Sequence, residues 1–164
     1  MNTRQEIAGE KHTLKIERAT IADAAEILAL QKLAYLSEAK LYNDYAIPPL
    51  TQTMEELVAD FGRKTFLKAV EDGGIVGSVN GLMKGDRCLI GRLMVHPDFQ
   101  GRGIGTLLMN AIEAGFADAR SWELFTGELS VKNIRLYERL GYSIVRKEQF
   151  QMSRFAVVFM EKRS

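Results

Sequence analysis

Apolar residues recur along this chain at two spacings, and each spacing predicts a type of element. Leu14 to Arg18 alternate between apolar and polar residues, which is typical of a short strand. The helix start signal Thr-x-x-Asp at Thr20 precedes apolar residues three and four apart, so we predict a first helix that ends within residues 38–44. Two prolines make residues 42–50 a predicted loop that excludes regular helix.

The middle of the chain predicts a short helix and three strands. The capping-box sequence Thr53-Met-Glu-Glu56 should open a helix that ends at Gly62. Three apolar runs follow, over residues 65–71, 75–83 and 88–95. Turns that contain Asp and Gly separate these runs, which indicates antiparallel hairpins. Gly91, inside the last run, predicts a bulge or a close backbone approach.

The last third of the chain predicts alternating helix and strand. Helical spacing over residues 104–120 leads to a strand over 122–126, and a crossover through a helix normally makes the flanking strands parallel neighbours. The remaining elements are a helix and an antiparallel pair of strands, over residues 131–140, 142–147 and 155–161. This order predicts an α/β (α+β) domain, with a mixed central sheet of about seven strands flanked by four helices.

Composition then narrows the class of protein. The chain has 164 residues, 46% hydrophobic and 26% charged, which suits one globular domain. Its 22 basic and 21 acidic residues nearly cancel, so we expect no nucleic acid and no membrane as partners. The only cysteine, Cys88, excludes a disulfide framework and a cysteine-based zinc site. Residues 1–12 predict a mobile polar segment without a signal core, and we expect a cytoplasmic protein.

The glycine-rich segment Gln100-Gly-Arg-Gly-Ile-Gly105 lies between a predicted strand and a predicted helix. Its glycines lack Cβ atoms, so the backbone can turn tightly and a bulky ligand can approach the N–H groups. The first N–H groups of a helix have no intrahelical partner and carry partial positive charge. This arrangement predicts a site for an anion, best matched by a phosphate.

The glycine spacing separates three kinds of phosphate-binding loop. A Walker loop needs a lysine after its last glycine, but Thr106 follows Gly105. The dinucleotide fingerprint needs Gly-x-Gly-x-x-Gly in the first strand-helix turn, whereas these glycines alternate deep in the chain. Glu123 follows the loop at about the spacing at which that fingerprint has its ribose-binding acid, so a dinucleotide oxidoreductase stays open. An ordinary glycine-rich turn without a ligand is the other alternative.

The third kind of loop carries a resemblance to a known family. Residues 100–105, preceded by Val95-His-Pro97, resemble the acetyl-coenzyme A motif of the GNAT N-acetyltransferase superfamily, Gln/Arg-x-x-Gly-x-Gly/Ala. The order of elements from Leu14 to Glu161 also matches that superfamily. The resemblance implies a GNAT-like acyl-CoA N-acyltransferase fold, a single N-acetyltransferase domain over residues 1–164, and acetyl-CoA as cosubstrate without a metal.

A second segment, with Asn133 and Tyr137 four residues apart and followed by Gly141-Tyr142, resembles the other signature of this superfamily. There the asparagine contacts the cofactor and the tyrosine protonates the departing thiolate, so the resemblance implies that Tyr137 is the general acid. A core tyrosine is the alternative. The implied cofactor-binding residues are Leu93, Met94, Val95, Gln100, Gly101, Arg102, Gly103, Ile104, Gly105, Thr106, Asn133, Tyr137 and Arg139.

The resemblance does not identify the general base or the acceptor as directly as it identifies the cofactor-binding residues. Better-known members of the superfamily place a glutamate on the fourth strand, but residues 87–95 contain no acid. Glu128 is the candidate base, and a solvated loop acid is the alternative. In this fold the first two helices wall the acceptor site, and an acid beside aromatic rings suits a cationic amine. The expected substrate-binding residues are therefore Tyr35, Tyr42, Asp44 and Tyr45.

The first functional hypothesis is an N-acetyltransferase, in which a primary amine attacks acetyl-CoA directly in a ternary complex. The amine belongs to an unidentified small molecule or protein. The alternative is a non-catalytic acyl-CoA-binding module of the same fold. The tyrosine-rich loop at residues 42–50 could equally form a dimer contact, so a homodimer stays open.

Overall fold

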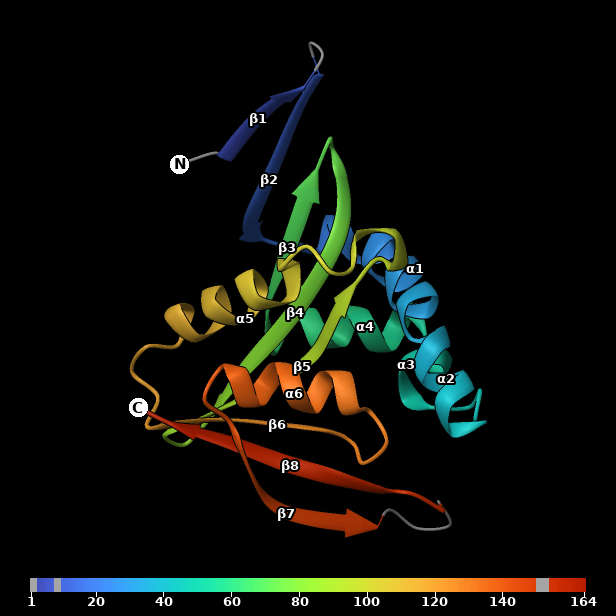
Figure 1. Ribbon diagram of the computed structural model, residues 1–164, viewed down its shortest axis with the longest axis vertical. Helices are drawn as coiled ribbons and strands as arrows, with labels where there is room; N and C mark the ends of the chain where they lie inside the picture. The colour runs from blue at the N-terminus through green and yellow to red at the C-terminus, as the bar shows by residue number, and fades with distance from the viewer. Residues whose placement is uncertain (1–2, 8–9, 150–153) are drawn as a thin grey trace.

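One mixed sheet of eight strands forms the centre of the fold, counted within residues 3–7, 10–149 and 154–164, which the computed structural model describes (Figure 1). The strands are β1 (Thr3–Ile7), β2 (Glu10–Arg18), β3 (Thr65–Glu71), β4 (Gly74–Lys84), β5 (Arg87–Val95), β6 (Ser121–Gly127), β7 (Ser143–Gln149) and β8 (Ala156–Arg163). They pair in the order β1-β2-β3-β4-β5-β6-β8-β7. All pairs are antiparallel except β5 with β6, which are parallel.

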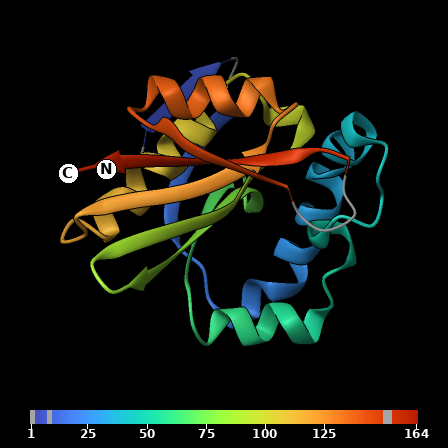
Figure 2. The same cartoon turned by 90° about the horizontal axis from the view of Figure 1, so that it is seen from below.

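Helices lie on both faces of this sheet (Figure 2). They are α1 (Ala24–Ala34), α2 (Leu36–Tyr42), α3 (Pro48–Thr51), α4 (Met54–Phe61), α5 (Ile104–Gly115) and α6 (Val131–Arg139). Short 3-10 turns, η1 (Ile21–Asp23) and η2 (Pro97–Phe99), precede α1 and α5. The helices α5 and α6 cover one face, and α1 and α4 cover the other.

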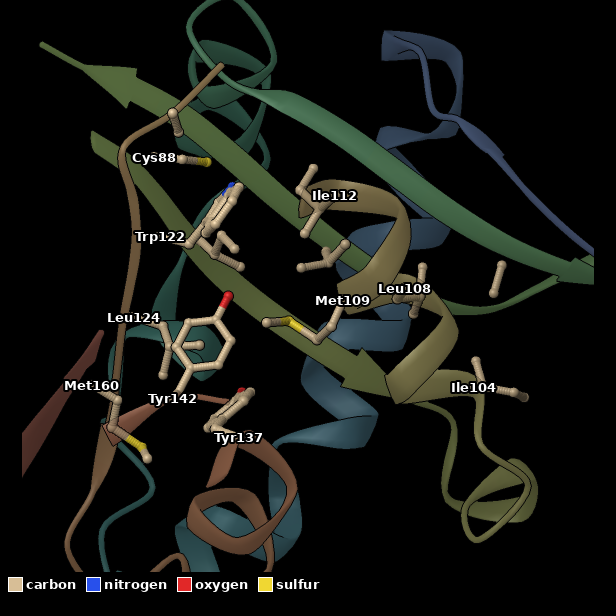
Figure 3. Close-up of a cluster of buried hydrophobic side chains, with 14 of the residues drawn as sticks. Cys88, Ile104, Leu108, Met109, Ile112, Trp122, Leu124, Tyr137, Tyr142 and Met160 are labelled. Carbon is tan, nitrogen blue, oxygen red and sulfur yellow. The ribbon is translucent and has the colours of Figure 1, made fainter. Parts of the chain in front are cut away.

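The larger core lies under α5 and α6, where apolar side chains from both helices meet those of the sheet (Figure 3). Leu108 of α5 has no exposed surface, and only 1% of Ile112 is exposed. Gly81 of β4 permits this contact, because a Cβ there would lie 2.7 Å from Phe116 Cε2 and 3.1 Å from Ile112 Cγ1. Close packing therefore fixes α5, and with it the loop at its start, against the sheet.

A second core lies on the opposite face, under α1 and α4. Ile27 of α1 and Leu57 of α4 are fully buried against β3 and β4. The predicted helix start signal at Thr20 forms a capping box on the η1 turn that precedes α1, and the one at Thr53 forms a capping box at the start of α4. These contacts fix the end of α1, from which α2 continues toward α6.

The structure confirms the antiparallel strands β3 to β5, the parallel pair β5 and β6, and the antiparallel pair β7 and β8. It also adds a strand, β1, and starts β2 at Glu10 rather than Leu14. These changes concern residues 3–7 and 10–13. The mobility expected for residues 1–12 stays a prediction. The helix α5 ends at Gly115 and not near Arg120.

The segment after α1 differs from its prediction in two ways. The expected single helix is broken at Tyr35, whose backbone dihedrals are φ −85° and ψ 0°, so it becomes α1 and α2. In the expected loop, Pro48–Thr51 forms one helical turn, α3. Proline is tolerated at the first positions of a helix because its missing N–H would have no partner there. The prolines therefore begin a helix rather than exclude one.

Candidate active site

A cavity of about 590 Å³ opens where β5 and β6 separate. The two strands pair only over Arg87–Leu89, although both continue beyond this segment. Most of the residues expected to bind the cofactor line the cavity: Leu93, Met94, Val95, Gln100, Gly101, Gly103, Ile104, Gly105, Thr106, Asn133 and Arg139. The fold thus brings the two sequence signatures to one site.

A bulge in β5 accompanies this separation. Its pairing with β4 passes from Gly91 to Met94, so Arg92 and Leu93 together stand opposite Val79. Arg92 has the left-handed dihedral φ 52°. The bulge predicted at Gly91 is confirmed, and since a bulge bends its strand, it accounts for the loss of pairing with β6.

The bulged end of β5 presents backbone donors to the cavity. His96 N–H points toward β4 and donates to Val76 O at 2.8 Å. Successive N–H groups of a strand point to opposite sides, so Val95 N–H points to the side that β6 has left. A donor in that position can bind a ligand oxygen.

The glycine-rich loop forms the adjoining wall. Gly101 and Gly103 have φ values of 78° and 80°, in the region that favours glycine, and Gly103 is the N-cap of α5. Gln100 Nε2 donates to Val95 O at 3.3 Å and so ties the loop to β5. The first N–H groups of α5 have no intrahelical acceptor, which leaves them free to donate to an anion.

Arg102 lies outside this wall, although it was expected to bind the cofactor. Its guanidinium donates twice to Glu71, at 2.7 and 3.1 Å, and Glu71 has only 4% of its side chain exposed. These hydrogen bonds, more than the accompanying charge attraction, raise the pKa of Arg102. The residue fastens the loop to the end of β3 instead of lining the cavity.

Asn133 and Tyr137 lie on α6, one turn apart. Asn133 lines the cavity, and its Nδ2 donates to Glu38 Oε1 at 2.8 Å. The Tyr137 ring packs edge-on against Tyr142, with centroids 6.1 Å apart (Figure 3). Only 7% of Tyr137 is exposed, so its ring belongs to the core.

Tyr137, expected to contact the cofactor, is not among the residues that line the cavity, but its hydroxyl lies near two that do, Tyr35 and Glu38. The hydroxyl makes no hydrogen bond within the described residues. If it were fully buried, it would be an unsatisfied polar atom, but among these residues Trp122 Nε1 is the only buried side-chain polar atom without a partner. The hydroxyl therefore keeps some exposure. Burial raises its pKa above the ordinary range, and nearby Tyr35 and Glu38 raise it further. At neutral pH this phenol is protonated, so it can serve as a general acid but not as a general base.

Glu38 is a cavity residue that we did not predict. It lies on α2, partly buried, and its carboxylate accepts from Ser130 Oγ and Asn133 Nδ2. Ser130 is the N-cap of α6 by position, but its hydroxyl serves this contact and does not cap the helix. No local signal marked Glu38, because its partners Ser130 and Asn133 lie more than 90 residues later in the chain.

The residues expected to bind the acceptor divide into two groups. Tyr35 lines the cavity, and its hydroxyl donates to Leu93 O in the bulge at 3.2 Å. Tyr42, Asp44 and Tyr45 do not line it. The Tyr42 hydroxyl accepts from the backbone of Leu129, and Asp44 accepts from the backbone of Ala46.

Glu128, the candidate base, also lies away from the cavity wall. Its carboxylate accepts from Ala156 N–H at 2.6 Å and lies 3.5 Å from Lys147 Nζ. The hydrogen bond from Ala156, followed by the attraction of Lys147, lowers the pKa of Glu128 despite partial burial. Glu128 therefore holds the start of β8 in place, and its lowered pKa makes its carboxylate a weak proton acceptor.

No helix among the described residues is long and apolar enough to cross a membrane. The same part of the chain contains no group of three or more His, Cys, Asp or Glu residues that could hold a metal ion.

Sequence comparisons are consistent with this geometry. Residues 62–144 match the family model of the acetyltransferase (GNAT) domain. The UPF0157 protein YqkA of Bacillus subtilis is 31% identical over 129 residues, which cover 79% of this chain and 36% of that protein. Acetyltransferase ECA0875 of Pectobacterium atrosepticum is 41% identical over 83 residues, covering 49% and 58%. The chain thus spans about a third to three-fifths of these curated relatives.

Solved structures share the whole fold. The PaiA N-acetyltransferase of Thermoplasma acidophilum, in complex with coenzyme A, has a TM-score of 0.77 at 16% identity and covers 92% of this chain and 99% of its own. YncA of Salmonella typhimurium, with acetyl-CoA, has a TM-score of 0.74 at 18% identity, covering 92% and 93%. The ribosomal-protein-S18-alanine N-acetyltransferase of Escherichia coli has a TM-score of 0.76 at 16% identity, covering 92% and 93%.

Proposed function

The chain belongs to the GNAT acetyltransferase family, and from this premise we propose that it transfers an acetyl group from acetyl-CoA to a primary amine. The observation that carries the proposal is the cavity between β5 and β6. One wall offers the N-terminal donors of α5 for a pyrophosphate, and another offers the bulged end of β5 for a thioester. Asn133 lines the same cavity, and Tyr137 follows it one turn later on α6.

The proposed reaction is direct attack in a ternary complex. The amine nitrogen bonds to the thioester carbon, and Val95 N–H donates to the developing oxyanion. The carbon–sulfur bond then breaks, Tyr137 protonates the coenzyme A thiolate, and the proton that the nitrogen loses on forming the amide restores the Tyr137 hydroxyl. A covalent acetyl-cysteine does not fit this site, because Cys88 is buried and burial raises the pKa of its thiol to about 11.

A non-catalytic acyl-CoA-binding module is the competing function, since the described residues of β5 provide no acid. An assay of free-thiol release with a panel of amines, corrected for hydrolysis, distinguishes the two. Amine-dependent thiol release supports the transferase. Tight acetyl-CoA binding without such release by any amine would identify a binding module instead. The Escherichia coli neighbour, named for an alanine of ribosomal protein S18, supports an amine acceptor but at 16% identity does not specify which one.

Two arginines near the proposed phosphate site should respond differently to replacement. Arg139→Ala should weaken acetyl-CoA binding by about threefold to tenfold, because Arg139 lines the cavity and can pair with phosphate. Arg102→Ala should instead lower the thermal midpoint of unfolding, because it leaves the buried Glu71 carboxylate without its partner. Isothermal titration calorimetry and thermal unfolding of both variants measure the two effects. An equal loss of affinity in Arg102→Ala, without loss of stability, would restore it as a phosphate ligand.

A further inference from the structure

Glu38 differs from the other poorly exposed glutamates in having no cationic partner. Glu71, Glu113 and Glu123 each form a salt bridge, with Arg102, Lys162 and Arg87 respectively. The Glu38 carboxylate accepts only from neutral groups, Ser130 Oγ at 2.9 and 3.0 Å and Asn133 Nδ2 at 2.8 Å. Within the described part of the chain, no Lys, Arg or His forms an ion pair with it.

The surroundings of Glu38 favour a cation from outside the protein. No Lys, Arg or His of the described residues forms an ion pair with this partly buried carboxylate, so a cation that enters the cavity meets little competition for it. Aromatic rings flank it: the Glu38 charge contributes to the raised pKa of Tyr35, Tyr42 and Tyr137, after the larger effect of burial. Tyrosine faces add a further attraction for an ammonium.

The rest of this cavity wall restricts the body of the ligand. Leu41, Leu129 and Val131 line the cavity and are exposed by 47%, 37% and 49%. Glu38 is the only acid among the described lining residues, whereas Lys132 and Arg139 contribute positive charge. A second ammonium on the same ligand would lie against a leucine or against another positive charge. The cavity wall therefore favours a ligand with a single positive charge and an apolar body.

We propose that Glu38 binds the ammonium of the acceptor and receives its proton, and that the acceptor is a monocationic primary amine with an apolar body. This inference rests on the proposed acetyl transfer. The ammonium gives one proton to Glu38, and its freed lone pair attacks the thioester carbon. The nitrogen loses its second proton after the bond forms. Of the two protons, one ends on the coenzyme A thiol by way of Tyr137 and the other leaves from Glu38 to solvent.

The test compares amines and carboxylate variants in the free-thiol assay. Phenethylamine supplies one charge on an apolar body, and spermidine supplies several charges without one. The wild type should show kcat/KM at least about tenfold higher with phenethylamine, since each mismatched polar or charged contact commonly changes specificity by that order. Glu38→Gln should lower kcat/KM for phenethylamine by about a hundredfold. Its amide oxygen can still accept from Asn133, so the Kd for acetyl-CoA should stay within about twofold.

The matched control is Glu138→Gln, which removes an exposed carboxylate of α6 outside the cavity wall and should leave the rate unchanged. Thermal unfolding checks that both variants are folded. Retention of the wild-type rate by folded Glu38→Gln would overturn the role of Glu38 while the transferase assignment stands. A preference for spermidine would overturn the acceptor class. If the wild type binds acetyl-CoA but releases no thiol with any amine, both the transfer activity and this inference are wrong.

Discussion

Gly105→Val is expected to weaken acetyl-CoA binding by about tenfold or more while leaving the protein folded. Gly105 occupies the first turn of α5 and lines the cavity. A Cβ there would lie 3.5 Å from Leu136 Cδ2, 3.9 Å from Leu93 Cδ2 and 3.9 Å from Val95 Cγ2, which are ordinary contacts. The family motif accepts alanine at this position, but the two methyl groups of valine extend beyond Cβ into the space through which a pyrophosphate would approach the backbone.

The free energy of unfolding should change by less than about 1 kcal/mol, because valine and glycine differ by no more than that in helix propensity. Calorimetric titration with acetyl-CoA and thermal unfolding measure the two quantities. Gly115→Val is the matched control: it lies on the same helix, outside the cavity wall, and its added Cβ would meet nothing within 4 Å. Gly103 is less suitable, since its φ of 80° would strain any replacement. Unchanged affinity in Gly105→Val would remove the start of α5 from the cofactor site.

Local signals in the sequence sufficed for the loop and for most of the fold. Gly101 and Gly103 have left-handed backbone conformations that few other residues adopt, so the residue type itself reports the geometry. Gly91 indicated the bulge that follows it, although the left-handed residue of that bulge is Arg92. Helix caps and Asp-Gly turns are also determined by a few neighbouring residues. Asn133 could be placed for a similar reason, because its spacing within one helix fixes the face on which it lies.

Contacts between distant segments could not be predicted in this way. Arg102 looked like a phosphate ligand, yet its partner Glu71 lies 31 residues earlier, at the end of another strand. Glu38 belongs to the site only because the chain breaks at Tyr35 and α2 meets the start of α6, 92 residues later. Both depend on how elements pack, and neither follows from the neighbouring residues alone.

Tyr137→Phe is expected to lower kcat by about a hundredfold, the usual contribution of general-acid assistance. The substitution keeps the ring and its contact with Tyr142 but removes the hydroxyl that would protonate the thiolate. That hydroxyl has no hydrogen-bond partner among the described residues, so its loss should leave the thermal midpoint and the acetyl-CoA affinity nearly unchanged. Because the pKa of Tyr137 is raised, the wild-type rate should not fall through loss of this proton at any pH below about 10.

Tyr142→Phe provides the opposite control on a neighbouring ring. Its hydroxyl donates to Glu113 Oε2 at 2.8 Å, away from the cavity, so this substitution should lower the free energy of unfolding by about 1–2 kcal/mol and leave kcat intact. Single-turnover measurements with an accepted amine ensure that chemistry limits the rate. A Tyr137→Phe protein that keeps the wild-type single-turnover rate would show that the thiolate leaves unaided or takes its proton elsewhere. Tyr137 would then be a core residue of α6, and the departing sulfur would have to be protonated by solvent that enters the same cavity.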